Sequence, residues 1–188
     1  MSDSGAGPDG STSQVLAASP VVGVALAVPE PWGRHLQRLR QDYGEPDAAH
    51  IPTHITLLPP TPVTPDRVAP LRQHLSSVAR SHAPFTVILR GTGTFRPVSD
   101  VVFVQVAQGV SSCERLERDV REGPVARRLD YPYHPHVTIS HNRSPEVLDR
   151  AFADLAAFSC TFEAASFRLY LHGGDGVWQV VEDFLLAG

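Results

Sequence analysis

The sequence predicts a single α+β domain built from two similar lobes, and three observations lead to this prediction. Short apolar runs that are typical of strands alternate along the chain with amphipathic segments that are typical of helices. The order of these segments repeats at an interval of about 80 residues, which indicates a duplicated unit. With 188 residues, the chain is long enough to bury a core in one domain or in two closely packed lobes.

The first half of the duplication covers about residues 20–95. It follows a tail, residues 1–19, that is rich in Ser, Gly and Ala and is expected to be flexible. Short apolar runs predict its strands, and prolines in the first turn predict its helix starts. The expected elements are a strand over residues 21–28, a helix opening at Pro31, a strand over about residues 50–58, a helix opening at Thr64-Pro65 and a strand over residues 85–90.

The second half, about residues 96–188, repeats this order and adds a strand. The strand starts at Val21 and Val101 differ by 80 residues. Ser111 and Glu114 form the pattern of a capping box, which predicts the start of a helix. The expected elements are a strand over residues 101–106, a helix ending at Gly123-Pro124, a strand over about residues 134–140, a helix opening at Ser144-Pro145, and strands over about residues 161–171 and 177–185 joined by Gly173-Gly174-Asp175-Gly176.

One short pattern, His-apolar-Thr-apolar, occurs at the corresponding place in each half, as His54-Ile55-Thr56-Leu57 and as His136-Val137-Thr138-Ile139. Successive side chains of a strand point to opposite faces, so each His shares a face with its Thr while the apolar residues enter a core. Duplicated lobes tend to pack about a pseudo-twofold axis. We therefore expect the two marked strands to line one cleft.

Two imidazoles that face each other across a cleft have the chemistry needed to open a cyclic phosphodiester. This reaction needs a base for the attacking water and an acid for the leaving oxygen. Imidazole, with an ordinary pKa of about 6.5, can serve as either near neutral pH. The threonine hydroxyls can hold the non-bridging phosphate oxygens. The plainer interpretation treats each Thr as a β-branched strand former and each His as a rim residue.

The chain resembles the 2H phosphoesterase superfamily over about residues 20–188. The resemblance rests on both motifs, on Pro135 before the second motif, on the order of strands and helices, and on the glycine-rich turn before the last strand. Within it, the chain is similar to the RNA 2′,3′-cyclic phosphodiesterase/2′-5′ RNA ligase-like (LigT-like) proteins. The resemblance implies a bilobal fold whose two antiparallel sheets line a central groove with helices outside, and chemistry without a cofactor. Leu58-Pro59-Pro60 replaces the aromatic residue and glycine usual in ligase-like proteins, and resembles less characterised bacterial members.

The resemblance also implies roles for the motif residues. His54 would protonate the leaving ribose oxygen and His136 would activate water in hydrolysis. In the reverse, ligating direction the two histidines would exchange these roles. Thr56 and Thr138 would hold the phosphate. The expected substrate is a small nucleotide or RNA end with a 2′,3′-cyclic phosphate, opened to a 2′-phosphate, or a 2′-5′ linkage. Two alternatives stay open: a nucleotide-binding or sensing module with little turnover, and a phosphodiesterase for a non-RNA small metabolite.

Four further residues are candidates for lining the groove, although each also fits a surface or packing role. Phe95 resembles a groove-lining aromatic residue of the family. Tyr133 and His134 come just before the second motif, where an aromatic ring can stack on a base. Arg143 comes just after it and can supply a cation for phosphate.

Composition limits the partners of the chain. The net charge of −4 argues against a general DNA binder, which is expected to be basic. No Lys or Arg precedes Arg34, so the basic segment of a secretory signal is not predicted. The apolar run over residues 21–28 is too short to span a membrane. We expect a cytoplasmic monomer. Two cysteines are too few for a disulfide framework, and the histidines around the second motif lack an accompanying carboxylate or cysteine motif, so no metal site is predicted.

Overall fold

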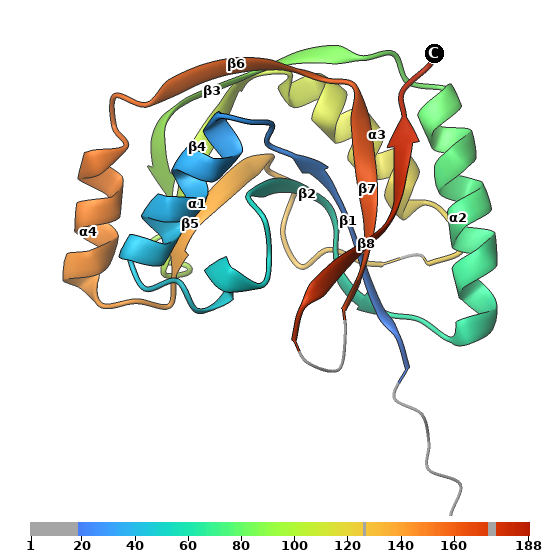
Figure 1. Ribbon diagram of the computed structural model, residues 1–188, viewed down its shortest axis with the longest axis horizontal. Coiled ribbons are helices and arrows are strands. Elements are labelled where there is room, and N and C mark those ends of the chain that lie inside the picture. Colours follow the sequence, from blue (N-terminus) through green and yellow to red (C-terminus); the bar gives the residue numbers. More distant parts are fainter. Residues whose placement is uncertain (1–18, 126, 173–175) are drawn as a thin grey trace, which may run out of the picture.

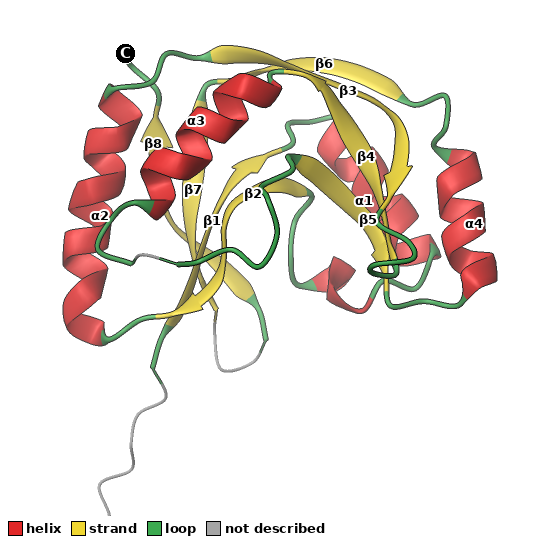
Figure 2. Ribbon diagram, turned by 180° about the vertical axis from the view of Figure 1, so that it is seen from behind, coloured by secondary structure: helices red, strands yellow, loops and turns green. Residues whose placement is uncertain are grey.

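The computed structural model describes residues 19–125, 127–172 and 176–188; the expected tail, apart from Ser19, and most of the expected glycine-rich turn lie outside them. Two four-stranded antiparallel sheets with four surrounding helices (Figures 1 and 2) confirm the predicted α+β class. The first sheet has the order β2 (His54–Pro62), β1 (Val21–Ala27), β7 (Ser166–His172), β8 (Trp178–Leu185). The second has the order β5 (His136–His141), β4 (Val101–Gln108), β3 (Phe85–Thr94), β6 (Ser159–Ala164).

The helices are α1 (Trp32–Asp42), α2 (Pro65–Arg80), α3 (Val110–Arg121) and α4 (Pro145–Asp154), with a short 3₁₀ helix, η1 (Pro46–Ala49), between α1 and β2. Among the described residues, none of the helices combines the length and the hydropathy that a membrane span requires.

Each sheet takes strands from both halves of the chain. β3, from the first half, lies between β4 and β6, and β7, from the second half, lies between β1 and β8. The single strand expected over residues 161–171 is therefore wrong, because β6 ends at Ala164, β7 begins at Ser166, and the two belong to different sheets. Ala165 carries no turn signal, and the segments on both sides alternate as strands do, so nothing local in the sequence marks the change of sheet.

The starts of three elements differ from the prediction. β2 begins at His54, after η1, and β5 begins at His136, so both motifs open their strands. The predicted capping box is wrong: α3 begins at Val110, its N-cap is Gly109, and no side chain caps it. Gly109 has a φ of 94°, a left-handed conformation that glycine adopts readily, so the backbone turn itself starts the helix before Ser111.

The apolar residues of both motifs lie in the core, as predicted. Ile55, Val137 and Ile139 are 0% exposed and Leu57 is 1% exposed. They belong to one continuous cluster with apolar residues of α2 and α3. The histidines and threonines of the motifs alternate with these buried residues and are half-buried, which places them on the opposite face of each strand.

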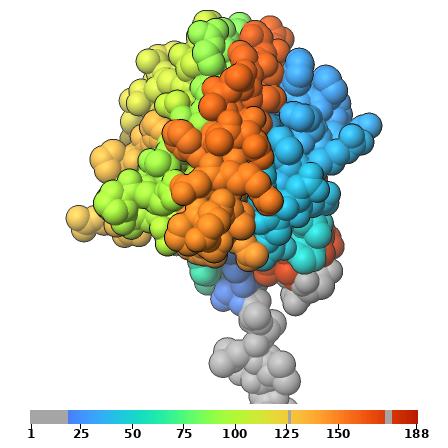
Figure 3. Space-filling model, turned by 90° about the vertical axis from the view of Figure 1, so that its left-hand side faces the viewer, coloured from blue at the N-terminus to red at the C-terminus, as the bar shows by residue number. Residues whose placement is uncertain are grey.

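α4 lies between the α1–η1 region and the end of β3 on the face drawn in Figure 3. There the orange atoms of this segment lie between the blue and cyan atoms of the α1–η1 region and green atoms near the end of β3. The Tyr43 hydroxyl donates a hydrogen bond to Asp154 at 3.0 Å, and Arg96 forms an ion pair with Asp149 at 2.8 Å. The helix is thus held by polar contacts on both sides.

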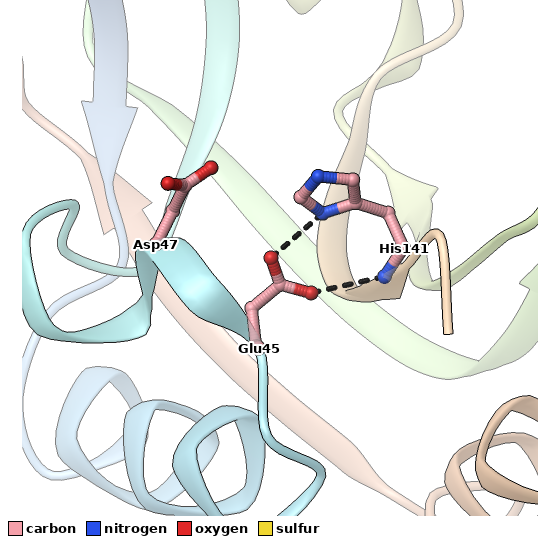
Figure 4. A group of neighbouring side chains, drawn as sticks. All are labelled: Glu45, Asp47 and His141. Atoms are coloured by element: carbon pink, nitrogen blue, oxygen red, sulfur yellow. Dashed lines mark hydrogen bonds and ion pairs between the residues drawn. The ribbon is translucent and has the colours of Figure 1, made fainter. Parts of the chain in front are cut away.

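A buried carboxylate makes a second junction (Figure 4). Glu45, just before η1, has a side chain that is 0% exposed. Its Oε1 lies 2.7 Å from Nδ1 of His141, and its Oε2 accepts the backbone N–H of His141 at 2.9 Å. Because His141 is the last residue of β5, this contact holds the strand of the second motif against the segment that leads into the first.

Glu45→Ala should lower the free energy of unfolding by about 2 kcal/mol, because it leaves a backbone N–H and an imidazole without their buried partner. Urea unfolding followed by circular dichroism measures this loss. The matched control is Glu30→Ala, which removes an exposed pair with Arg34 (3.6 Å) and should cost about 0.5 kcal/mol or less. Equal losses in the two variants would contradict the role given to Glu45.

Candidate functional site

The two motifs lie on neighbouring strands in the middle of the molecule. β2 and β5 are each at one edge of their sheet, and they contact one another (Figure 1). This arrangement agrees with the expectation that the marked strands lie close together. The site is therefore built where the two sheets meet.

Both motif histidines are held by the same local hydrogen bond. Nδ1 of His54 lies 2.6 Å from the carbonyl oxygen of Pro52, and Nδ1 of His136 lies 2.6 Å from the carbonyl oxygen of His134. A carbonyl oxygen can only accept, so Nδ1 carries the proton in each neutral ring. Nε2 of each ring is then left with a lone pair for a ligand.

Burial shifts both rings toward the neutral form. It lowers the pKa of His54 to about 4, against the opposing effect of the Pro52 hydrogen bond and with help from the charges of Arg40 and His136. Burial also lowers the pKa of His136, with a further contribution from His134 and opposition from its backbone hydrogen bond. The two rings stand at the starts of β2 and β5, the edge strands that contact one another.

A pocket of about 560 Å³ lies on the β5 side of the site. Its lining includes three of the predicted groove residues, Phe95, Tyr133 and His134, together with His136. The Phe95 ring meets the His136 ring edge to face, with centroids 5.1 Å apart. The Tyr133 hydroxyl donates a hydrogen bond to the carbonyl oxygen of Thr56 at 2.9 Å, which ties the loop before β5 to β2. Arg127 and Arg128 also line this pocket.

A smaller pocket, of about 60 Å³, lies on the β2 side. It is lined by His54 and Thr56, and also by Tyr170 of β7 and Trp178 of β8. Thr56 lines both pockets, so they adjoin at the first motif. Tyr170 and Trp178 were not predicted as site residues, because their strands carry no motif and only the pairing of β7 with β1 brings them to the groove.

Two predicted residues lie outside these two pockets. Arg143 packs beside Gly44, where an added Cβ would lie 3.3 Å from its Nη2, and it lines neither pocket. Thr138 pairs with Phe103 across β5 and β4 and is half-buried, but it lines neither pocket. The structure thus brings His54, Thr56 and His136 to the adjoining pockets, and Thr138 is not among the residues that line them.

One set of metal-ligand side chains was found among the described residues, and it is not the one considered from the sequence. Glu45, Asp47 and His141 have ligand atoms within 4.8 Å of one another (Figure 4). Both Glu45 oxygens already contact His141, and the charges of Glu45 and Asp47 both act on buried Arg40. Within this set, Glu45 and His141 are thus each other's contact partners.

Comparison with known proteins places the chain among phosphoesterase-like sequences. A family model described as the 2′-5′ RNA ligase superfamily matches residues 28–176. A Bacillus licheniformis protein named "Putative phosphoesterase" is 26% identical over 145 residues, which are 76% of this chain and 85% of that protein. A protein of the same description from Halalkalibacterium halodurans is 27% identical over 167 residues, 88% of this chain and 96% of its own.

Solved structures share the fold. TT0787 of Thermus thermophilus superimposes with a TM-score of 0.63 at 24% identity, covering 89% of this chain and 98% of that one. Escherichia coli LigT complexed with 3′-AMP has a TM-score of 0.62 at 19% identity, covering 90% of this chain and 99% of LigT.

The lowered pKa of His54 can be tested by NMR titration of the histidine rings, with the signal assigned by its loss in His54→Ala. We expect a midpoint near pH 4 for His54. The unfolded chain binds this proton near pH 6.5, so the free energy of unfolding should fall as pH is lowered from about 6.5 to 4. His54→Ala should flatten that dependence; a His54 midpoint at or above 6.5 would contradict the burial argument.

Proposed function

Since the chain belongs to the 2′-5′ RNA ligase superfamily, we propose that it is a phosphodiesterase working by acid–base catalysis between His54 and His136. Its substrate is a nucleotide or RNA end with a 2′,3′-cyclic phosphate, which it opens to a 2′-phosphate, or a 2′-5′ linkage. One observation carries the proposal: two imidazoles at the starts of contacting strands line adjoining pockets, and each is held through Nδ1 by a backbone carbonyl, which leaves its Nε2 for a ligand.

The proposed reaction conserves protons. Nε2 of His136 takes a proton from water as its oxygen attacks phosphorus, and protonated His54 gives one to the leaving 3′-oxygen as the P–O3′ bond breaks. His54 is neutral in the free protein near pH 7, so the negative charge of the bound phosphate must stabilise its protonated form. The Thr56 hydroxyl holds the non-bridging oxygens as charge builds on them, and Thr138, on the same face of β5 as His136, is the second hydroxyl of the proposed site.

The relatives support this chemistry in outline. The Bacillus licheniformis and Halalkalibacterium halodurans proteins carry the name of a phosphoesterase, and LigT has been solved with 3′-AMP and with phosphate. A nucleotide with a phosphate on its ribose is therefore a suitable ligand class for the adjoining pockets. The Phe95 ring against His136 offers such a ligand an aromatic contact beside the phosphate.

His54→Ala and His136→Ala should each lower the rate of hydrolysis of nucleoside 2′,3′-cyclic phosphates, measured in EDTA, by about two to four orders of magnitude, the usual contribution of a general acid or base. Separation of 2′- from 3′-phosphate products by chromatography gives the regiochemistry. His35→Ala is the control, because His35 is an exposed residue of α1 that stacks on Phe158, away from both pockets. Full activity in both motif variants would exclude the proposed reaction.

A further inference from the structure

The ring of Phe103 lies against the imidazole of His136. Phe103 pairs with Thr138 across β4 and β5, and directly opposed residues of paired strands point to the same face of a sheet. The Phe103 ring therefore lies on the face that carries the second motif, and its centroid is 5.0 Å from that of the His136 ring. Phe103 is only 4% exposed and lines neither pocket, so it contacts His136 from a position that a ligand does not reach.

Two further rings complete an aromatic cluster around this contact. The cluster consists of Phe95, Phe103, His134 and His136, and all six of its ring pairs have centroids between 4.4 and 6.0 Å apart. The tightest pair joins Phe95 to Phe103, at 4.4 Å. Aromatic rings at such distances attract one another in defined relative orientations, so the two phenyl rings restrict the orientation of the imidazole that both of them contact.

A glycine on the next strand makes room for the Phe103 ring. Gly93 pairs with Phe103 across β3 and β4. A Cβ added at Gly93 would lie 2.5 Å from Cε2 and 2.6 Å from Cζ of Phe103, which is far closer than carbon atoms pack. The ring thus occupies the space of the missing side chain. Gly93, Phe103 and His136 form a row of contacts across three neighbouring strands.

This row complements the hydrogen bond that already holds His136. The bond from Nδ1 to the carbonyl oxygen of His134 fixes one atom of the imidazole and constrains the plane of the ring less. Contact with two phenyl rings fixes that plane and with it the direction of Nε2. The same contacts keep water from the ring, and burial is the main cause of the lowered pKa of His136.

We propose that Phe103 is a positioning residue for His136: its ring, packed against Gly93, fixes the plane of the imidazole so that Nε2 points at the attacking water. The inference rests on the proposed function, in which His136 is the base, and adds to it a residue that acts only through that base. Phe103 transfers no proton and contacts no substrate.

Phe103→Leu should lower kcat for nucleoside 2′,3′-cyclic phosphates by about 10- to 100-fold, the effect of a misplaced catalytic group, with KM changed by less than about twofold. Phe184→Leu is the matched control. Phe184 is also 4% exposed, and its ring stacks on Phe167, outside both pockets. This variant should lose comparable stability and keep its kcat. Equal losses of kcat in the two variants would reduce Phe103 to a packing residue and overturn the inference.

Gly93→Ala tests the same row without removing any side chain. The added Cβ must displace the Phe103 ring, so kcat should fall here too, which keeps the test available if Phe103→Leu does not fold. If both effects pass through the ring, Gly93→Ala combined with Phe103→Leu should be no slower than Phe103→Leu alone. Losses that multiply in the double variant, or an unchanged kcat in Gly93→Ala, would contradict the proposed row.

NMR of the His136 ring, with the signal assigned by its loss in His136→Ala, gives a readout that needs no substrate. Phe103→Leu should move the titration midpoint of His136 upward, toward the ordinary pKa of an imidazole, because water reaches the ring. Its ring ¹⁵N shifts should change from the Nδ1–H form to a mixture of tautomers, while Phe184→Leu alters neither.

These spectra separate the two possible failures. An unaltered protein that hydrolyses no cyclic phosphate, but whose His136 responds to Phe103→Leu as expected, would overturn the proposed function and leave the positioning contact standing. A His136 midpoint and tautomer that stay unchanged in Phe103→Leu would overturn the inference, whatever the activity of the unaltered protein.

Discussion

The exchange of strands between the two halves is the constraint on which the rest of the structure depends. β3 completes the sheet of β4 and β5, and β7 completes the sheet of β1 and β2. Each four-stranded sheet therefore contains strands of both halves. Because β7 pairs with β1 and β3 pairs with β4, β2 and β5 remain at the edges of their sheets, and there they contact one another. The position of the site follows from this pairing order.

The place of the two histidines at the start of their strands explains why both rings make the same hydrogen bond. Each motif histidine is the first residue of its strand, so the carbonyl two residues earlier lies outside the strand's backbone pairing and is free to accept the ring N–H. A proline stands in each of these short approaches, Pro52 in one and Pro135 in the other, and fixes part of the backbone. Two sequences that differ elsewhere thus reach the same tautomer, with the same nitrogen left for a ligand.

The sequence predicted those parts of the molecule that depend on local alternation and on repetition. Alternation placed Ile55 and Val137 in the core and the histidines on the other face, and the 82-residue spacing of the motifs indicated equivalent positions. Alternation says which side of a strand a residue takes, but it does not say which sheet the strand joins. The break at Ala165 and the arrival of Tyr170 at the groove were therefore hidden, since both depend on pairing between segments far apart in the chain.

The unequal environments of the two rings bear on which one acts as the acid. Burial lowers the pKa of both rings, to about 4 at His54, where the charge of buried Arg40 adds to the effect. Under the proposed reaction, the phosphate supplies the charge that allows one ring to hold a proton. A ring with a lowered pKa gives up a proton readily once it is protonated, but His54 holds one near neutral pH only while the phosphate is bound. The proposed role of His54 as the proton donor in hydrolysis therefore depends on the charge of the bound ligand.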